Sequence, residues 1–154
     1  MANTYTQLYI HLVFAVKGRQ HLIHATWEED LYKYITAVIH NDGHKLIAIN
    51  GMPDHIHIVY GLKPAIAIAD TVKDIKRATS NWINKQNYCV GKFAWQEGYG
   101  AFSYSRSQLN DLVNYVLQQK QHHKKKTFKE EYVDMLERFG VDYDAQYLFD
   151  FLIE

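Results

Sequence analysis

The chain has few features that would cross-link it or anchor it in a bilayer. Its 154 residues include one cysteine, Cys89, which excludes an intrachain disulfide and gives no zinc-finger pattern. No apolar run approaches the roughly 20 residues of a membrane-spanning helix. The first residues, Met1 to Thr4, lack the basic and apolar regions of a signal peptide. We therefore expect a cytoplasmic protein. The length of 154 residues predicts a single domain over residues 1–154, and the 47% of hydrophobic residues is typical of a globular protein.

Net charge is also absent, but the zero conceals an asymmetry along the chain. Residues 1–126 carry 15 Lys and Arg against 9 Asp and Glu, whereas residues 127–154 carry 2 against 8. A basic body suits an anionic partner such as a nucleic acid. An ordinary mixed-charge surface would explain the same counts, so charge alone leaves the partner open.

Hydrophobic periodicity predicts a core over residues 4–105 in the order strand–helix–strand–strand–helix–strand. Thr26 and Glu29 form a capping-box pattern at the start of the first helix, and Pro53 and Asp54 mark the turn of a hairpin. This order is that of the α+β ferredoxin-like (split βαβ) fold, with helices on one face of an antiparallel sheet and the other face open for function. The expected strands cover residues 4–16, 45–52, 55–62 and 93–105, and the expected helices cover 26–41 and 70–86.

Two further helices are predicted after this core. The first runs over about residues 108–123 and carries Tyr115. A second capping box, Thr127 with Glu130, begins the next helix, which ends before Gly140. It opens an acidic extension over residues 127–154, in which we also expect a short last helix.

His55 and His57 are separated by one residue in a predicted strand. Alternate side chains of a strand leave the same face, so their roots lie roughly 6.5–7 Å apart. Two imidazole nitrogens at that separation can meet on one divalent ion. A pair of ordinary histidines on a polar face would give the same pattern.

Tyr115 lies on the polar side of its predicted helix. On a helical wheel it points roughly 120° away from the apolar cluster. A phenol presented in this way can attack a phosphodiester, and a metal held by the two histidines can act as the Lewis acid. The oxygen of Gln119, one turn later, suits a hard ion such as Mg²⁺ or Mn²⁺. A solvated surface aromatic is the alternative. The apolar cluster comprises Leu109, Leu112, Val113 and Val116, and the residues beside Tyr115 are Asp111, Gln119 and His122.

Taken together, these motifs resemble the single-tyrosine HUH transposases of bacterial insertion sequences, named for the pattern His–hydrophobic–His. The resemblance covers nearly the whole chain. It is carried by residues 50–57 (NGMPDHIH), 95–103 (WQEGYGAFS), 115–119 (YVLQQ) and 122–128 (HHKKKTF).

This resemblance implies an enzyme with defined chemistry. His55, His57 and Gln119 would bind a divalent metal, Mg²⁺ or Mn²⁺, with no nucleotide cofactor. Tyr115 would attack single-stranded DNA and leave a 5′-phosphotyrosine and a free 3′-hydroxyl. The DNA would carry hairpin ends, and the protein would be nucleoid-associated when bound to it. The resemblance also implies a homodimer, in which the tyrosine helix can complete the active site of the partner subunit.

Several basic residues are candidate phosphate contacts, although a solvated face explains each of them as well. Three further residues are expected around the site: His11 as a structural neighbour of the histidine pair, and Asp111 and His122 as neighbours of Tyr115. The candidate DNA contacts are Lys73, Lys76, Arg77, Arg106, Lys120 and Lys124.

Two other functions stay open at this point. A domesticated relative acting on repetitive palindromic DNA would keep the same chemistry. A ferredoxin-like nucleic-acid-binding module without catalysis would not, and the three motifs argue against it. The sequence leaves open the target DNA, the physiological metal, and whether the tyrosine helix serves its own chain or its partner's.

Overall fold

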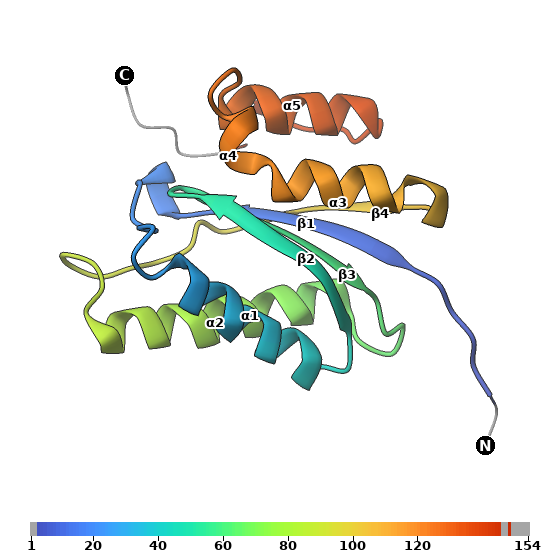
Figure 1. Cartoon of the computed structure of the whole chain (residues 1–154), viewed down its shortest axis with the longest axis horizontal. Helices are drawn as coiled ribbons and strands as arrows, with labels where there is room; N and C mark the ends of the chain where they lie inside the picture. Colours follow the sequence, from blue (N-terminus) through green and yellow to red (C-terminus); the bar gives the residue numbers. More distant parts are fainter. Residues whose placement is uncertain (1–2, 146–147, 149–154) are drawn as a thin grey trace.

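Four strands form one antiparallel sheet at the centre of the molecule (Figure 1). The computed structural model describes residues 3–145 and 148. The spatial order is β2-β3-β1-β4, with β1 and β3 in the middle. The strands are β1 (Tyr9–Ala15), β2 (Lys45–Met52), β3 (His55–Gly61) and β4 (Gly100–Tyr104).

Helices cover both faces of this sheet (Figure 1). On one face lie α1 (Glu28–Asn41) and α2 (Ile68–Gln86), and this α+β arrangement confirms the predicted fold. On the other face lie α3 (Leu109–Leu117), α4 (Gln119–His122) and α5 (Phe128–Arg138). Short 3-10 turns occupy Lys17–Arg19 and Arg106–Gln108. No helix in the described part of the chain is long and apolar enough to cross a membrane.

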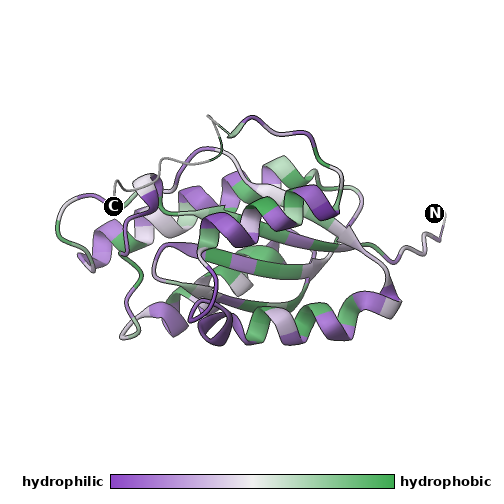
Figure 2. Ribbon diagram, turned by 90° about the horizontal axis from the view of Figure 1, so that it is seen from above, coloured by the Kyte–Doolittle hydropathy of each residue, from purple (hydrophilic) through white to green (hydrophobic). Residues whose placement is uncertain are grey.

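The second face is therefore not open, contrary to our expectation. This face is covered because β1 and β3 carry apolar, buried side chains on both sides. Phe14 and Ile58 point towards α1 and α2, whereas Val13, Ala15 and Val59 point the other way and need a second cover. The C-terminal helices supply it. Figure 2 shows long apolar stretches in the central strands and alternating polar and apolar residues along the helices.

The hairpin between β2 and β3 brings the histidine pair to the start of a central strand. Met52 pairs with His55 across the predicted Pro53–Asp54 turn. Gly51 permits this close approach, because a Cβ there would lie 2.5 Å from the carbonyl oxygen of His55.

Three predicted boundaries of the core were wrong. The first strand, expected from residue 4, begins at Tyr9, where pairing with β3 and β4 starts. The first helix begins at Glu28 after Trp27, and no side chain caps it, so Thr26 is not its N-cap. The buried Trp27 ring, stacked on Tyr88 at 4.9 Å between centroids, fixes the chain there instead. Residues 93–99 form no strand apart from the bridge between Trp95 and Val16. At Phe93 the side chain of Asn84 binds both backbone groups, and the carbonyls of Gln96 and Gly98 accept from Lys76.

Two boundaries after the core also need comment. The expected helix over residues 108–123 is broken at Gln118, where φ is −100° and ψ is 20°, and this break separates α3 from α4. Thr127 does cap α5, since its Oγ1 accepts the backbone N–H of Glu130 at 3.2 Å. The short last helix expected after Gly140 lies mostly outside the described residues.

Candidate active site

His55 and His57 lie on the same face of β3, the face covered by the C-terminal helices. They pair across the ladder with Ala15 and Val13 of β1. Both imidazoles are fully buried, although we expected the second face of the sheet to be open. The reason is α5, whose Phe128 ring stacks on His55 at 3.7 Å between centroids.

Each of the two rings is held by a partner at its Nδ1 atom. Asp54 Oδ1 lies 2.7 Å from His55 Nδ1, and Asp54 is itself buried and approached by Arg19 at 3.6 Å. His11 Nε2 lies 2.7 Å from His57 Nδ1, which places His11 beside the pair, where the pairing of β1 with β3 puts it. With both Nδ1 atoms engaged, the two Nε2 atoms are left to face a common centre.

A carboxylate from α5 occupies that centre. Glu131 Oε1 lies 3.1 Å from His57 Nε2 and 3.6 Å from His55 Nε2. A third imidazole, His123, approaches the same oxygen at 3.2 Å. The Glu131 side chain is only 5% exposed, so these contacts are shielded from water.

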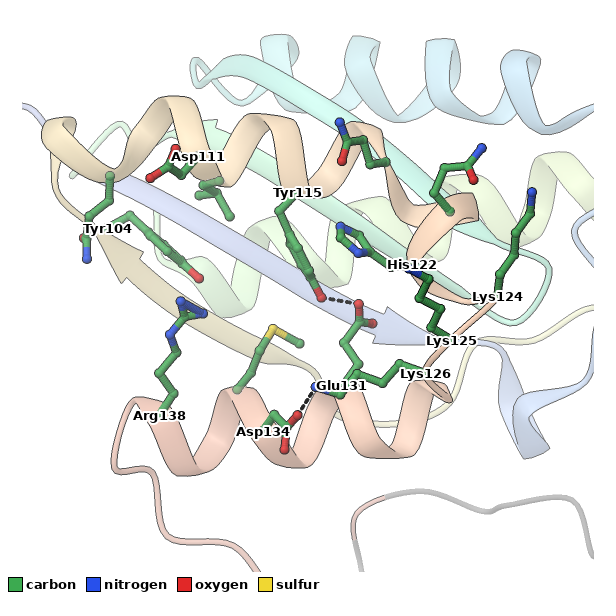
Figure 3. A pocket seen from close by; sticks show the side chains of 15 residues that line it. Tyr104, Asp111, Tyr115, His122, Lys124, Lys125, Lys126, Glu131, Asp134 and Arg138 are labelled. Atoms are coloured by element: carbon green, nitrogen blue, oxygen red, sulfur yellow. Dashed lines mark hydrogen bonds and ion pairs between the residues drawn. The ribbon is translucent and has the colours of Figure 1, made fainter.

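Tyr115 reaches the same carboxylate from α3. Its hydroxyl donates to Glu131 Oε2, and Figure 3 shows the two side chains pointing towards each other from facing helices. Gln119 Nε2 donates to that oxygen at 3.1 Å, and Gln119 Oε1 lies 3.4 Å from His55 Nε2. The nucleophile candidate and the histidine pair thus meet on one side chain within a single chain.

The close packing of these ionisable groups shifts their pKa values. Burial alone would raise the pKa of Glu131, but hydrogen bonds from His123, His55 and His57 hold it well below its usual range. Burial and the Glu131 carboxylate together raise the pKa of Tyr115, so its hydroxyl stays protonated in this arrangement. Burial lowers the pKa of His57, whereas bonds to Asp54 and Glu131 outweigh burial and raise that of His55.

The donor atoms fit a divalent cation. An ion bonded at about 2.1 Å separates neighbouring donor atoms by about 3.0 Å in an octahedron and by about 3.4 Å in a tetrahedron. The distances from Glu131 Oε1 to the two Nε2 atoms are 3.1 and 3.6 Å, and donor atoms of His55, His57 and Glu131 all lie within 4.8 Å of one another. Imidazole nitrogens mixed with carboxylate and amide oxygens suit ions such as Mn²⁺ and Mg²⁺.

A hollow of about 780 Å³ between α3 and α5 leads to Tyr115 and Glu131 (Figure 3). Asp111 and His122, the two expected neighbours of Tyr115, line it, and the ring of His122 lies 4.8 Å from that of Tyr115. Its cationic lining residues are Lys124, Lys125, Lys126 and Arg138.

Only Lys124 of the six candidate DNA contacts lines this hollow. Lys73, Lys76 and Arg77 lie on α2, across the sheet from Tyr115. The ammonium of Lys76 donates to two backbone carbonyls, those of Gln96 and Gly98, each at 2.7 Å.

The remaining two candidates lie elsewhere. Lys120 forms an ion pair with Glu28 at 3.1 Å and donates to the Gly51 carbonyl, so it fastens α4 to the sheet hairpin. Arg106 is exposed in the turn before α3. The structure does not test whether these residues contact DNA.

Sequence reasoning missed three residues of this site: Glu131, His123 and Asp54. A signal existed for each. In α5, Phe128, Tyr132 and Met135 lie on one side of the helix, as helical periodicity predicts for residues that pack on the sheet. Glu131 is an acidic residue beside this apolar stripe. His123 follows Gln119 by one helical turn, and Asp54 directly precedes His55.

Comparison with known families identifies the class of protein to which this fold and site belong. The sequence model of the IS200-like transposases matches residues 4–119, which is more than half of the chain. The chain therefore belongs to the IS200-like transposase family.

Individual relatives agree with this assignment. The ISDra2 transposase TnpA of Deinococcus radiodurans is 25% identical over 115 residues, covering 71% of this chain and 82% of that protein. A transposase structure from Deinococcus radiodurans R1 superposes with a TM-score of 0.61 at 22% identity, covering 77% of this chain and 95% of that one. A REP-associated tyrosine transposase bound to a REP hairpin gives a TM-score of 0.61 at 14% identity, covering 80% and 73%. The two structures support the fold.

Proposed function

We propose that this transposase cleaves and rejoins single-stranded DNA through a covalent bond to Tyr115, with a divalent metal held by His55 and His57. One observation carries the proposal: the Tyr115 hydroxyl and the Nε2 atoms of both histidines converge on one carboxylate. This convergence supports the proposal, because a metal at the histidines would lie beside the attacking hydroxyl.

The reaction exchanges one phosphodiester for another. The phenol oxygen of Tyr115 forms a bond to phosphorus, and the bond from phosphorus to the 3′ oxygen breaks. The phenol proton leaves and the departing 3′ oxygen gains a proton. The DNA 5′ end then stays on Tyr115, and a 3′-hydroxyl reverses the step on the same or another strand. The number of phosphate ester bonds is unchanged, so no nucleotide hydrolysis is needed.

Different residues would bind the metal, orient its ligands and present the nucleophile. His55, His57 and Gln119 would hold the metal, whose contribution is to neutralise and polarise the scissile phosphate. Asp54 and His11 orient the two imidazoles through their Nδ1 atoms. The hydroxyl of Tyr115 faces the hollow between α3 and α5, through which a strand can approach.

For the DNA we propose a single strand with hairpin ends, and for the assembly a homodimer. Support for the hairpin comes from the REP-associated relative, which was solved with a REP hairpin. The cationic residues around the hollow, Lys124 to Lys126 and Arg138, suit the phosphates of a flanking strand. Lys126 is paired with Asp134, which makes Lys124, Lys125 and Arg138 the more available of these.

The test is a covalent adduct. A labelled single-stranded oligonucleotide with a hairpin and flanks, taken from the DNA bordering the gene, is incubated with protein and Mn²⁺ or Mg²⁺. Denaturing gels should show a metal-dependent protein–DNA band, and Tyr115→Phe should abolish it while changing DNA affinity less than about threefold, because only the nucleophilic oxygen is lost.

Tyr143→Phe is the matched control, because Tyr143 is also a tyrosine bonded to a glutamate, Glu137, but lies away from the site. It should form the adduct normally. An adduct that persists in Tyr115→Phe would contradict the proposal. Tight binding without any adduct in the unmodified protein would favour the non-catalytic binding module.

A further inference from the structure

We propose that Glu131 of α5 joins the cation to the nucleophile: Oε1 is a metal ligand and Oε2 positions the hydroxyl of Tyr115. This inference rests on the proposed function, since it concerns the same metal and tyrosine. It adds a residue from a third element and gives α5 a role in the site beyond covering the sheet.

The first argument is charge. Glu131 is buried, and the groups that bond it are imidazoles, an amide and a phenol. Among the described residues, no ion pair joins it to a lysine or arginine. A buried carboxylate without a permanent cation is costly, and imidazoles, which carry a charge only when protonated, compensate it only in part. A divalent ion at the Nε2 atoms would supply the missing positive charge.

The second argument is geometry. The contacts of Glu131 divide by oxygen: Oε1 faces the imidazoles of His55, His57 and His123, and Oε2 faces Tyr115 and Gln119. An ion bonded to His55 and His57 would have Oε1 at the spacing of a neighbouring ligand. The adjacent oxygen then holds the phenol next to the ion without making it a ligand, which is where an attacking group is needed.

A merely structural role is the rival explanation, in which Glu131 only ties α5 to the sheet. Both roles predict loss of stability when Glu131 is replaced, so stability cannot separate them. Metal affinity can, because a structural tie affects it only through unfolding. Glu131→Gln keeps the side-chain volume and an oxygen that can accept from Tyr115, and it removes the anionic ligand.

The experiment is calorimetric titration of the metal-free full chain with Mn²⁺ alone, without DNA. Glu131→Gln should weaken Mn²⁺ binding at least 10-fold, while circular dichroism shows the helical content retained. Glu130→Gln is the matched control, because Glu130 is the exposed neighbour in the same turn of α5, and it should change affinity less than twofold. Unchanged Mn²⁺ affinity in Glu131→Gln would overturn the proposal.

The link to the nucleophile is tested by a double-mutant cycle on the same Mn²⁺ affinity. Tyr115→Phe removes the hydroxyl that orients the carboxylate, so it should weaken binding several-fold in the wild-type background. The effect should vanish in the Glu131→Ala background, because the two residues act through one contact. Independent, additive effects would refute the positioning role.

These titrations are independent of the DNA chemistry. If the wild-type protein binds Mn²⁺ through Glu131 but forms no DNA adduct, the proposed function fails and this assignment stands. If the adduct forms and Glu131→Gln binds Mn²⁺ normally, this assignment fails alone.

Discussion

His44 and His57 show, at the scale of single residues, how partners decide what a buried histidine can do. The Nε2 atom of His57 faces Glu131 Oε1 in the candidate site, whereas both nitrogens of His44 form hydrogen bonds that hold the fold together. His44 Nδ1 accepts the backbone N–H of Lys63 at 2.9 Å, so Nε2 carries the proton and donates to Thr71 Oγ1 at 2.7 Å. His44 is therefore held neutral in one tautomer and tethers the start of β2 to α2.

This tether predicts a dependence of stability on acid. Burial lowers the pKa of His44 below 6.5 in the folded protein, so the unfolded chain binds the extra proton more readily. The contribution of His44 is complete above about pH 6.5 and is lost as the pH falls towards the folded pKa. When the pH is lowered from 8 to 5, the free energy of unfolding, measured with urea, should fall less in His44→Gln than in the wild type. Parallel pH profiles for the two proteins would show that protonation of His44 is not coupled to folding.

The residues of the candidate site were predictable to different degrees. The alternation of a strand put His55 and His57 on one face, and the helical wheel separated Tyr115 from the core side of its helix. Periodicity could place Glu131 beside the apolar stripe of α5, but its contact with the histidines depends on how α5 packs against β1 and β3. That packing is a tertiary contact that local periodicity does not contain.

At the scale of elements, periodicity predicted most strands and helices, and its errors lie at the ends of elements and at one break. Asn84 takes the backbone groups of Phe93 that a strand would have used. The break at Gln118 lets Gln119 turn inwards and become fully buried beside His55. A wheel drawn through an unbroken helix cannot show such a turn.

We expect the N-cap residue Thr127 to stabilise the first turn of α5. Losing the cap in Thr127→Ala should cost about 1 kcal/mol, which is about a fivefold increase in local opening. Hydrogen exchange of the α5 amides should accelerate by that factor, and Thr127→Ser, which keeps the hydroxyl, should exchange as the wild type does. Equal exchange in Thr127→Ala and the wild type would mean that packing of Phe128 and Tyr132 holds this turn without the cap.

At the scale of the whole molecule, the sheet separates two functions of the chain. The face under α1 and α2 carries the larger apolar core, and the face under α3 to α5 carries smaller apolar clusters on either side of the site. A route to the tyrosine then exists between α3 and α5 instead of across an open sheet. Cleavage of DNA would consequently require the strand to enter between two helices of one chain or those helices to move apart.

Whether a homodimer shares its active sites can be decided by mixing two inactive variants. In this structure the hydroxyl of Tyr115 and the ring of His57 contact the same Glu131 carboxylate of their own chain. Tyr115→Phe protein mixed with a His57 variant therefore should form no adduct above the sum of the two alone. His57→Asn is preferable to alanine, because His57 is fully buried and truncation would leave a cavity. Subunit exchange must be verified with differently tagged copies. Recovery of adduct formation after exchange would show that the tyrosine helix crosses to the partner.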